Sequence, residues 1–274
     1  MSAKLRLLFA GVAVVLCLVS CARNSTPTPE QIDALFEPIT STYGIRIVYE
    51  IDDEFPPILI GGGGAHAKLC ELEPIDLAVL ARYPAILEAA LSRYPPHVIE
   101  KYLNAVYFAG TMIDYGIGAV GTYDIFRRII YLIDDGSRTD QEAIATFHHE
   151  MSSLLPFRRS EFLNPWEEQN PEGFQYFSEI YHSQDDIYAG TSTLDGSEEI
   201  YEMGFMNSYG FTNLENDYNE YAKMIFTNPE KFRELMERYP RIRGKFDMFL
   251  KIYQSVDPIF TEEYLLGPPP SSSP

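Results

Sequence analysis

The segment from Thr146 to Ser153 carries the residues best suited to chemistry. It reads Thr-Phe-His-His-Glu-Met-Ser-Ser. In the metal-binding motif His-Glu-x-x-His, two imidazoles four residues apart lie on one helical face and bind a metal, while the glutamate activates a metal-bound water. His149 and Glu150 fit the first half of this motif, but Ser153 stands where the second histidine belongs. The segment predicts a hydrolytic zinc site that lacks one imidazole.

The flanking sequence predicts that this segment is helical. Ile125–Ile133 is rich in β-branched and aromatic residues and precedes the turn formers of Asp134–Ser137, as expected of a strand and a turn. Thr139 stands three residues before Glu142, which is the spacing of a capping box, and Pro156 ends the segment. Apolar residues recur between them at steps of three and four, at Ile144, Phe147, Met151, Leu154 and Leu155. The motif is therefore expected on an amphipathic helix.

A metal at His149 needs further ligands, and the acidic segment around Glu215 is the natural source. At about 100° per residue, one face of this helix is apolar, with Leu214, Tyr218, Tyr221, Ala222 and Ile225. Glu215 and Asp217 flank that face, so they are the preferred ligands. Glu220 points roughly opposite, is expected to face water, and is kept in reserve. Its pairing with Asn219 resembles the third-ligand helix of thermolysin-like enzymes.

Each of these acids also has a purely structural interpretation. Thr212 and Glu215 have the spacing of another capping box. Asp217 fits a first-turn acid that the helix dipole favours. His148 and His182 are reserve ligands that would replace the missing imidazole. If neither completes the site, the metal is weak or absent, because a neutral serine hydroxyl is a poor zinc ligand and Ser153 would instead hydrogen-bond a neighbour.

The start of the chain predicts secretion and lipidation. Lys4 and Arg6 precede an apolar run from Leu7 to Val19, which is too short for a membrane span and typical of a signal peptide. The run closes with Leu-Val-Ser-Cys, which resembles the bacterial lipobox, so Cys21 is the expected acylation site. Ala22 is not an inner-membrane retention signal, and we therefore expect an outer-membrane lipoprotein. An ordinary signal peptide with an incidental cysteine is the alternative.

Composition limits the partners and the redox chemistry. The chain has 40 acidic and 21 basic residues, a formal charge of −19, which disfavours binding to nucleic acid. Its cysteines are Cys17, which leaves with the signal, Cys21, which takes lipid, and Cys70. The mature chain therefore cannot form an internal disulfide.

The sequence favours an α+β fold with strands early and helices late. We expect a signal over residues 1–21, a flexible tether over 22–35, one domain over 36–267 and a disordered tail over 268–274. Within the domain we expect strands at Tyr43–Ile51, Val98–Phe108 and Ile125–Ile133, a helix over Asp76–Tyr94 with a break at Pro84, and mostly helix from Asp140 onward. Gly61–Gly64 lacks the Gly-Lys-Ser/Thr of a phosphate loop and is interpreted as a loop.

Several short motifs share their order with a known family. They are the lipobox, His-His-Glu-x-Ser-Ser, the run Tyr201–Tyr209, Leu-Glu-Asn-Asp-Tyr-Asn from Leu214, Tyr239-Pro-Arg-Ile and Asp257-Pro-x-Phe-Thr-Glu. Together they resemble the zinc-binding metallopeptidase lipoproteins associated with outer-membrane nutrient import, over most of the mature chain. This resemblance implies a zincin-like domain with a single zinc. It also implies a TonB-dependent receptor and surface glycan- or peptide-binding lipoproteins as neighbours.

Two functions follow from these observations, and the first is the leading hypothesis. In the first, a lipid-anchored zinc peptidase holds its metal with His149 and either Glu215 or Asp217, and Glu150 takes a proton from the attacking water. In the second, a zincin scaffold has lost its metal and binds a peptide or glycan through part of its 19 tyrosines and 17 phenylalanines. Ser153 favours the second.

Overall fold

The computed structural model describes most of the chain downstream of the expected signal. The described residues are 26–51, 59–60, 68–69, 71–114, 117–180 and 196–267. The expected lipidation site Cys21, the reserve ligand His182, Cys70, the Gly61–Gly64 run and the 268–274 tail lie outside them. None of the helices within these ranges is both long and apolar enough to cross a membrane.

A four-stranded sheet forms one side of the molecule. Its order is β1 (Arg46–Val48), β5 (Ala105–Ala109), β9 (Ile129–Ile133) and β8 (Gly121–Asp124). The first three strands are parallel, and β8 is an antiparallel edge strand. All residues of β5 and β9 are buried, because continuous apolar strands such as Ala-Val-Tyr-Phe-Ala occupy the centre of a sheet that is covered on both faces.

Two smaller sheets lie beside this one. The first pairs β2 (Leu59–Ile60) with β3 (Lys68–Leu69), and the second has the order β4 (Glu71–Glu73), β6 (Thr111–Asp114) and β7 (Ile117–Gly118).

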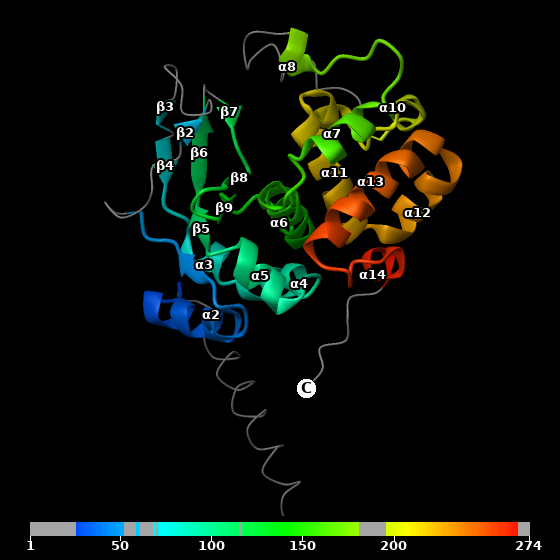
Figure 1. Cartoon of the computed structure of the whole chain (residues 1–274). Coiled ribbons are helices and arrows are strands. Elements are labelled where there is room, and N and C mark those ends of the chain that lie inside the picture. Colours follow the sequence, from blue (N-terminus) through cyan, green and yellow to red (C-terminus); the bar gives the residue numbers. More distant parts are fainter. Residues whose placement is uncertain are drawn as a thin grey trace, which may run out of the picture.

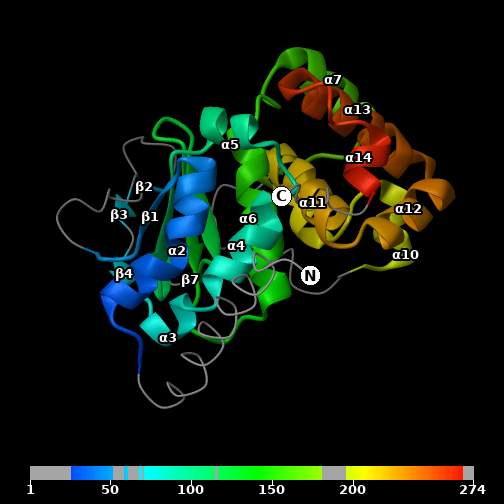
Figure 2. The ribbon, with the colours of Figure 1, turned by 90° about the horizontal axis from the view of Figure 1, so that it is seen from below.

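Helices make up the rest of the described chain. Before the sheet is complete come α2 (Pro29–Tyr43), α3 (Leu77–Leu80), α4 (Tyr83–Leu91) and α5 (Pro96–Tyr102). After it come α6 (Asp140–Leu154), α7 (Ser160–Glu167), α8 (Phe177–Ile180), α10 (Glu198–Met203), the short η1 (Ser208–Phe211), α11 (Leu214–Thr227), α12 (Pro229–Arg238), α13 (Pro240–Val256) and α14 (Glu262–Leu266). Helix α6 lies between the sheet and the C-terminal helices in both views (Figures 1 and 2). It packs against β8, β9 and α4 on one side and α11 on the other.

This arrangement confirms the mixed helix and sheet architecture, and the described chain after β9 is helical as predicted, but α2, α3, α4 and α5 already occur among the early strands. Helix α6 begins after Thr139, and both hydrogen bonds of the predicted capping box with Glu142 are present. The predicted break near Pro84 also occurs, since α3 ends at Leu80 and Pro84 lies in the first turn of α4. A continuous buried core joins the sheet, α2, α4, α6, α11 and α13.

Several predicted boundaries were wrong. Residues 96–102 form helix α5 rather than the start of a strand, because Pro96 begins a helix whose Val98 and Ile99 face the core. Helix α2 starts inside the expected 22–35 tether, where Thr28 and Gln31 form a capping box. Helix α2 and its αL cap at Gly44 occupy the start of the predicted strand, so the first strand covers only Arg46–Val48. Residues 125–128 form the turn between β8 and β9.

Candidate functional site

The edge strand β8 and helices α6 and α11 enclose a cavity of about 810 Å³. Both motif residues, His149 and Glu150, line it. The edge strand contributes Gly121, Thr122 and Tyr123. The remaining lining includes Asn207, Tyr209, Glu215, Asn216, Asn219, Glu220, Lys223 and the methionines Met112, Met206 and Met224. The cavity is therefore the candidate functional site, and we refer to it as the main cavity.

His149 is paired with Glu220, which sequence periodicity had placed toward water. The Nδ1 atom of His149 lies 3.1 Å from Oε1 of Glu220, and Glu220 is only 3% exposed. Lys223 Nζ lies 3.1 Å from Glu220 Oε2, and the amide of Asn207 donates to the same oxygen. The expectation of a water-facing Glu220 was wrong because α11 is buried on both sides, with α6 and η1 covering the face opposite its apolar stripe.

The electrostatics of this pair favour an ion pair. Burial would raise the pKa of Glu220, but the charge of Lys223 and the hydrogen bond from His149 lower that pKa to about 2. Burial would lower the pKa of His149, but the hydrogen bond to Glu220 and the charges of Glu150 and Glu220 raise it. With its proton on Nδ1, His149 donates to an ionised Glu220.

Glu150 lies deep in the main cavity and is 7% exposed. Burial raises the pKa of its carboxyl to about 7, and the charges of Glu215 and Glu220 add to this against the opposing effect of His149. Gly121 of β8 packs directly on it: a Cβ at Gly121 would lie 2.9 Å from Glu150 Oε1 and 2.6 Å from Thr146 Cγ2. A glycine is needed here so that the edge strand can approach α6.

Ser153, at the position of the missing imidazole, is completely buried between α6 and α11. Its Oγ accepts a hydrogen bond of 2.7 Å from Nδ2 of Asn219. Ser152 Oγ lies 2.5 Å from Asn219 Oδ1, so the amide is bonded at both ends. Sequence analysis named Asn219 only as the neighbour of Glu220. Two features of the sequence could have indicated this contact. They are the adjacent serines Ser152 and Ser153 on α6 and the amide of Asn219 next to Glu220 on α11.

Glu215 lines the main cavity but does not cap its own helix. Asn213 is the N-cap of α11 and accepts from the backbone N–H of Asn216. The carboxylate of Glu215 lies 2.6 Å from Arg158 Nη2, and Arg158 also donates to the hydroxyl of Tyr123. The capping-box interpretation of Glu215 is therefore corrected, and its charge is already neutralised by an arginine.

Asp217 does not join His149. It is fully buried and is not among the residues that line the main cavity. Its Oδ2 accepts hydrogen bonds from Lys245 Nζ at 2.7 Å, Trp166 Nε1 at 2.8 Å and the Tyr176 hydroxyl at 2.8 Å. The structure thus corrects the choice of Asp217 as a preferred ligand, because this carboxylate is held by a buried lysine on the far side of α11.

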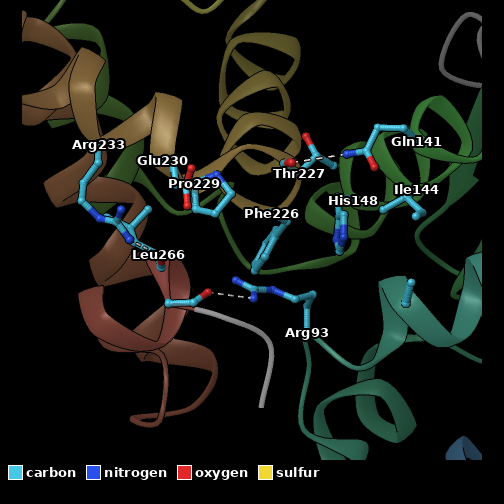
Figure 3. Close-up of a pocket in the computed structure, with 12 residues that line it drawn as sticks. Arg93, Gln141, Ile144, His148, Phe226, Thr227, Pro229, Glu230, Arg233 and Leu266 are labelled. Atoms are coloured by element: carbon cyan, nitrogen blue, oxygen red, sulfur yellow. Dashed lines mark hydrogen bonds between the residues drawn. The ribbon is translucent and has the colours of Figure 1, made fainter. Parts of the chain in front are cut away.

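His148 lies on a different face of α6 from its neighbour His149. It is fully buried, its Nδ1 lies 2.9 Å from the Tyr94 hydroxyl, and its ring stacks on Phe226 with centroids 4.7 Å apart. Burial lowers the pKa of His148 to about 3. It lines a second, smaller pocket, shown in Figure 3, rather than the main cavity. His148 therefore does not replace the missing imidazole in the main cavity.

The described residues do not fit a catalytic zinc site. Such a site has three protein ligands and an open position. Among the described residues, no group of three or more His, Cys, Asp or Glu side chains is placed to hold a metal. Ser153 is engaged by Asn219, Glu215 by Arg158, and Asp217 by Lys245. His149 lines the main cavity, but the other predicted ligands among the described residues are already paired or lie elsewhere.

Comparisons with known proteins give limited guidance. No protein-family model matches this sequence, and no curated protein matches it. A similar solved structure is the crystal structure of a putative zinc-binding metallo-peptidase from Bacteroides caccae ATCC 43185. The two chains are 15% identical, the match covers 87% of this chain and 95% of that chain, and the TM-score is 0.47. At this level of similarity, function has to be inferred from the residues of this chain.

Proposed function

We propose that this protein is a zincin-like lipoprotein that lacks a catalytic zinc and binds an extended peptide in the main cavity. The observation that carries this proposal is the hydrogen bond from Asn219 Nδ2 to Ser153 Oγ, which closes the position of the second imidazole. Both residues are at most 1% exposed. The geometry thus favours the binding protein over the peptidase.

The serine–asparagine network opposes metal binding in two ways. A neutral hydroxyl is a weak zinc ligand, and Ser153 Oγ already accepts a hydrogen bond from Asn219 Nδ2. Turning Ser153 toward a metal would leave the buried amide of Asn219 unsatisfied, at a cost of about 1–3 kcal/mol. The zinc would then have to be held by His149 without a second imidazole, and losing even an outer-shell partner lowers metal affinity roughly 10- to 100-fold.

The edge strand supports a peptide as the ligand. Val120 O accepts a hydrogen bond from Ile133 N, so residues 120, 122 and 124 occupy the positions that bond to β9. By the alternation of an antiparallel pair, the backbone groups of Gly121 and Tyr123 then point away from β9, toward an edge that no strand of the described chain covers. Both residues line the main cavity. An extended peptide added beside β8 would satisfy these groups, as in other cases of strand addition.

The lining suits side chains of several kinds. Met112, Met206 and Met224 give the cavity a deformable apolar surface, because methionine adapts its shape to different partners. Lys223 and Asn216 place a cation and an amide in the same cavity. At about 810 Å³ the cavity lies within the usual range of ligand sites, roughly 300–1,000 Å³.

The direct test is peptide binding without metal. Fluorescein-labelled random hexapeptides are titrated with purified protein in EDTA, and binding is followed by fluorescence anisotropy. We expect saturable binding, and no new peptide termini by mass spectrometry when zinc is supplied. Tyr123→Pro removes the outward N–H of β8 and should weaken binding about tenfold, the cost of one lost hydrogen bond. Tyr123→Val is the matched control, because it also removes the ring but keeps the N–H.

Three results would contradict the proposal. Zinc-dependent cleavage of the peptides would identify a hydrolase. Binding of maltoheptaose without binding of peptides would identify a glycan site. An equal loss of peptide affinity in Tyr123→Pro and Tyr123→Val would show that the edge strand does not pair with the ligand.

The cellular setting is a separate proposal, supported by the lipobox and the family resemblance. Acyl chains on Cys21 would hold the protein at the outer membrane. There it would deliver peptide to a TonB-dependent receptor and its surface lipoproteins. Metabolic labelling with palmitate tests the anchor: label should enter the wild-type protein in the outer-membrane fraction and be lost in Cys21→Ser. Label retained in that variant would exclude Cys21 as the acylation site.

A further inference from the structure

A second pocket of about 360 Å³ lies on the other side of α6 from the main cavity. Figure 3 shows the side chains that line it, contributed by α6, the ends of α11 and α14, the start of α12 and the residue Arg93 just after α4. The proposed peptide binding makes no use of this pocket. Two of its polar groups, on Arg93 and His148, have unusual surroundings.

Arg93 is a buried cation that forms no ion pair with an acid in the described part of the chain. It is 5% exposed, and its guanidinium donates to two backbone carbonyls, from Nη2 to Leu265 O at 2.7 Å and from Nη1 to Gly267 O at 3.1 Å. Its buried Nε has no hydrogen-bond partner within the described part of the chain. Burial lowers the pKa of Arg93, and no carboxylate is among the groups that offset this. Buried charges are normally paired, because removing an ion from water is costly.

His148 lines the same pocket and carries a second buried polar atom. Its Nε2 is buried and has no partner among the described residues, while its Nδ1 faces the Tyr94 hydroxyl. The ring of Phe226 aligns the two groups: His148 stacks on it, and the Arg93 guanidinium lies 5.4 Å from its centroid. With a proton on Nε2, His148 and Arg93 are two donors at one pocket.

The rest of the pocket suits an organic anion better than an inorganic one. Arg233 of α12 adds a second guanidinium to the lining and donates a hydrogen bond to Leu266 O. The acid in the lining is Glu230, which is exposed. Apolar atoms come from Ala89, Ile144, Phe226, Pro229 and Leu266. A carboxylate would satisfy the unpaired donors, and a short hydrocarbon tail would cover the apolar wall.

We infer that this pocket binds a small organic carboxylate, held by Arg93, His148 and Arg233. A purely structural role for Arg93 as a cap on the C-terminus of α14 explains its Nη contacts with Leu265 and Gly267. It does not explain the unsatisfied Nε of Arg93 or Nε2 of His148. The carboxylate accounts for both.

The test uses hexanoate, with hexanamide as the neutral probe of the same shape and inorganic phosphate as the anion without a tail. Isothermal titration calorimetry of the purified protein should show one hexanoate site with a Kd on the order of 0.1–1 mM. Hexanamide and phosphate should each bind at least about tenfold more weakly, because each lacks one of the two interactions.

Variants locate the site. Arg93→Gln should weaken hexanoate binding at least about tenfold, which is the loss expected for a hydrogen bond between charged groups. Arg233→Gln should weaken it by a smaller factor, and this variant keeps the protein folded even if Arg93→Gln does not, because Arg233 is exposed. Arg46→Gln, an exposed arginine on β1, is the matched control and should leave the Kd unchanged. In the wild-type protein, hexanoate should also shift the His148 ring signals, assigned by their loss in His148→Phe.

Absence of a saturable hexanoate site would overturn the inference. So would tighter binding of phosphate than of hexanoate, which would indicate an inorganic anion site. Hexanoate binding that is unchanged in Arg233→Gln and leaves the His148 signals unmoved would place the ligand elsewhere.

Discussion

Asp217 and Glu220 are three residues apart on α11, yet they serve different regions of the molecule. Asp217 faces the core between α7 and α13, where it is held by Lys245, Trp166 and Tyr176. Glu220 faces the main cavity, where His149 and Lys223 neutralise it. Both acids are nearly inaccessible, and each is paired with a lysine. Acids near a histidine–glutamate motif are therefore not evidence of a metal site unless they are free to coordinate.

Among the substitutions that test the contrast between Asp217 and Glu220, we expect the largest loss of stability at Asp217. Asp217→Ala should destabilise the protein by about 3–5 kcal/mol, because it leaves the charge of Lys245 buried and unpaired. Burial already lowers the pKa of Lys245 to about 8 despite the neighbouring carboxylate. Urea denaturation at pH 7 measures the loss.

The matched control removes both charges. Asp217→Leu combined with Lys245→Met should recover most of the lost stability, because no ion is left without a partner. A loss below about 1 kcal/mol in Asp217→Ala would show that the core ion pair is not what distinguishes Asp217 from Glu220.

On the cavity side, Glu150 should be a source of instability at high pH. Its pKa is raised from 4.5 to about 7 in the folded protein, so the folded state resists ionisation and loses stability between these two pH values. Above pH 7 the cost should reach about 3 kcal/mol, at 1.36 kcal/mol per pKa unit. Glu150→Gln should therefore stabilise the protein by up to that amount at pH 8.5 and have no effect of this origin at pH 4.

Denaturation curves across the pH range measure this difference. Glu100→Gln, an exposed acid on α5, is the control and should show no such trend. If Glu150→Gln increases the stability by the same amount at pH 4 and pH 8.5, burial of the Glu150 charge is not the cause of the increase.

The smallest effect is expected at Glu215, at the open side of the main cavity. The side chains of Glu215 and Arg158 are 27% and 39% exposed, so Glu215→Gln should cost less than about 1 kcal/mol. The stability difference between the wild-type protein and Glu215→Gln should be smaller still in 1 M NaCl, because salt screens exposed charges. A larger, salt-independent loss would place Glu215 in the same class as Asp217.

Local sequence signals predicted the elements well but not their partners. The capping box at Thr139 and the apolar spacing defined α6, and the predicted stripe on α11 is buried at Tyr218, Tyr221, Ala222 and Ile225 and partly buried at Leu214. Periodicity identifies one buried face of a helix. It could not show that the opposite face of α11 is buried too, which is why Glu220 was placed in water.

The candidate site depended on contacts between distant segments. The bond between Asn219 and Ser153 joins residues 66 positions apart, and the pair of His149 with Glu220 spans 71 positions. Neither has a local pattern in the sequence. The same is true of Lys245, whose partner could be identified only once α13 was packed against α11.

The central claim is that Ser153 and Asn219 have closed the metal position, and zinc content tests it most directly. The wild-type protein and the variant Ser153→His with Asn219→Ala are incubated with zinc, desalted and measured by inductively coupled plasma mass spectrometry. The account predicts well below one zinc per wild-type chain and a clear gain in the double variant, which restores the second imidazole and removes the amide that fills its place. One zinc per wild-type chain, lost in His149→Ala, would contradict it.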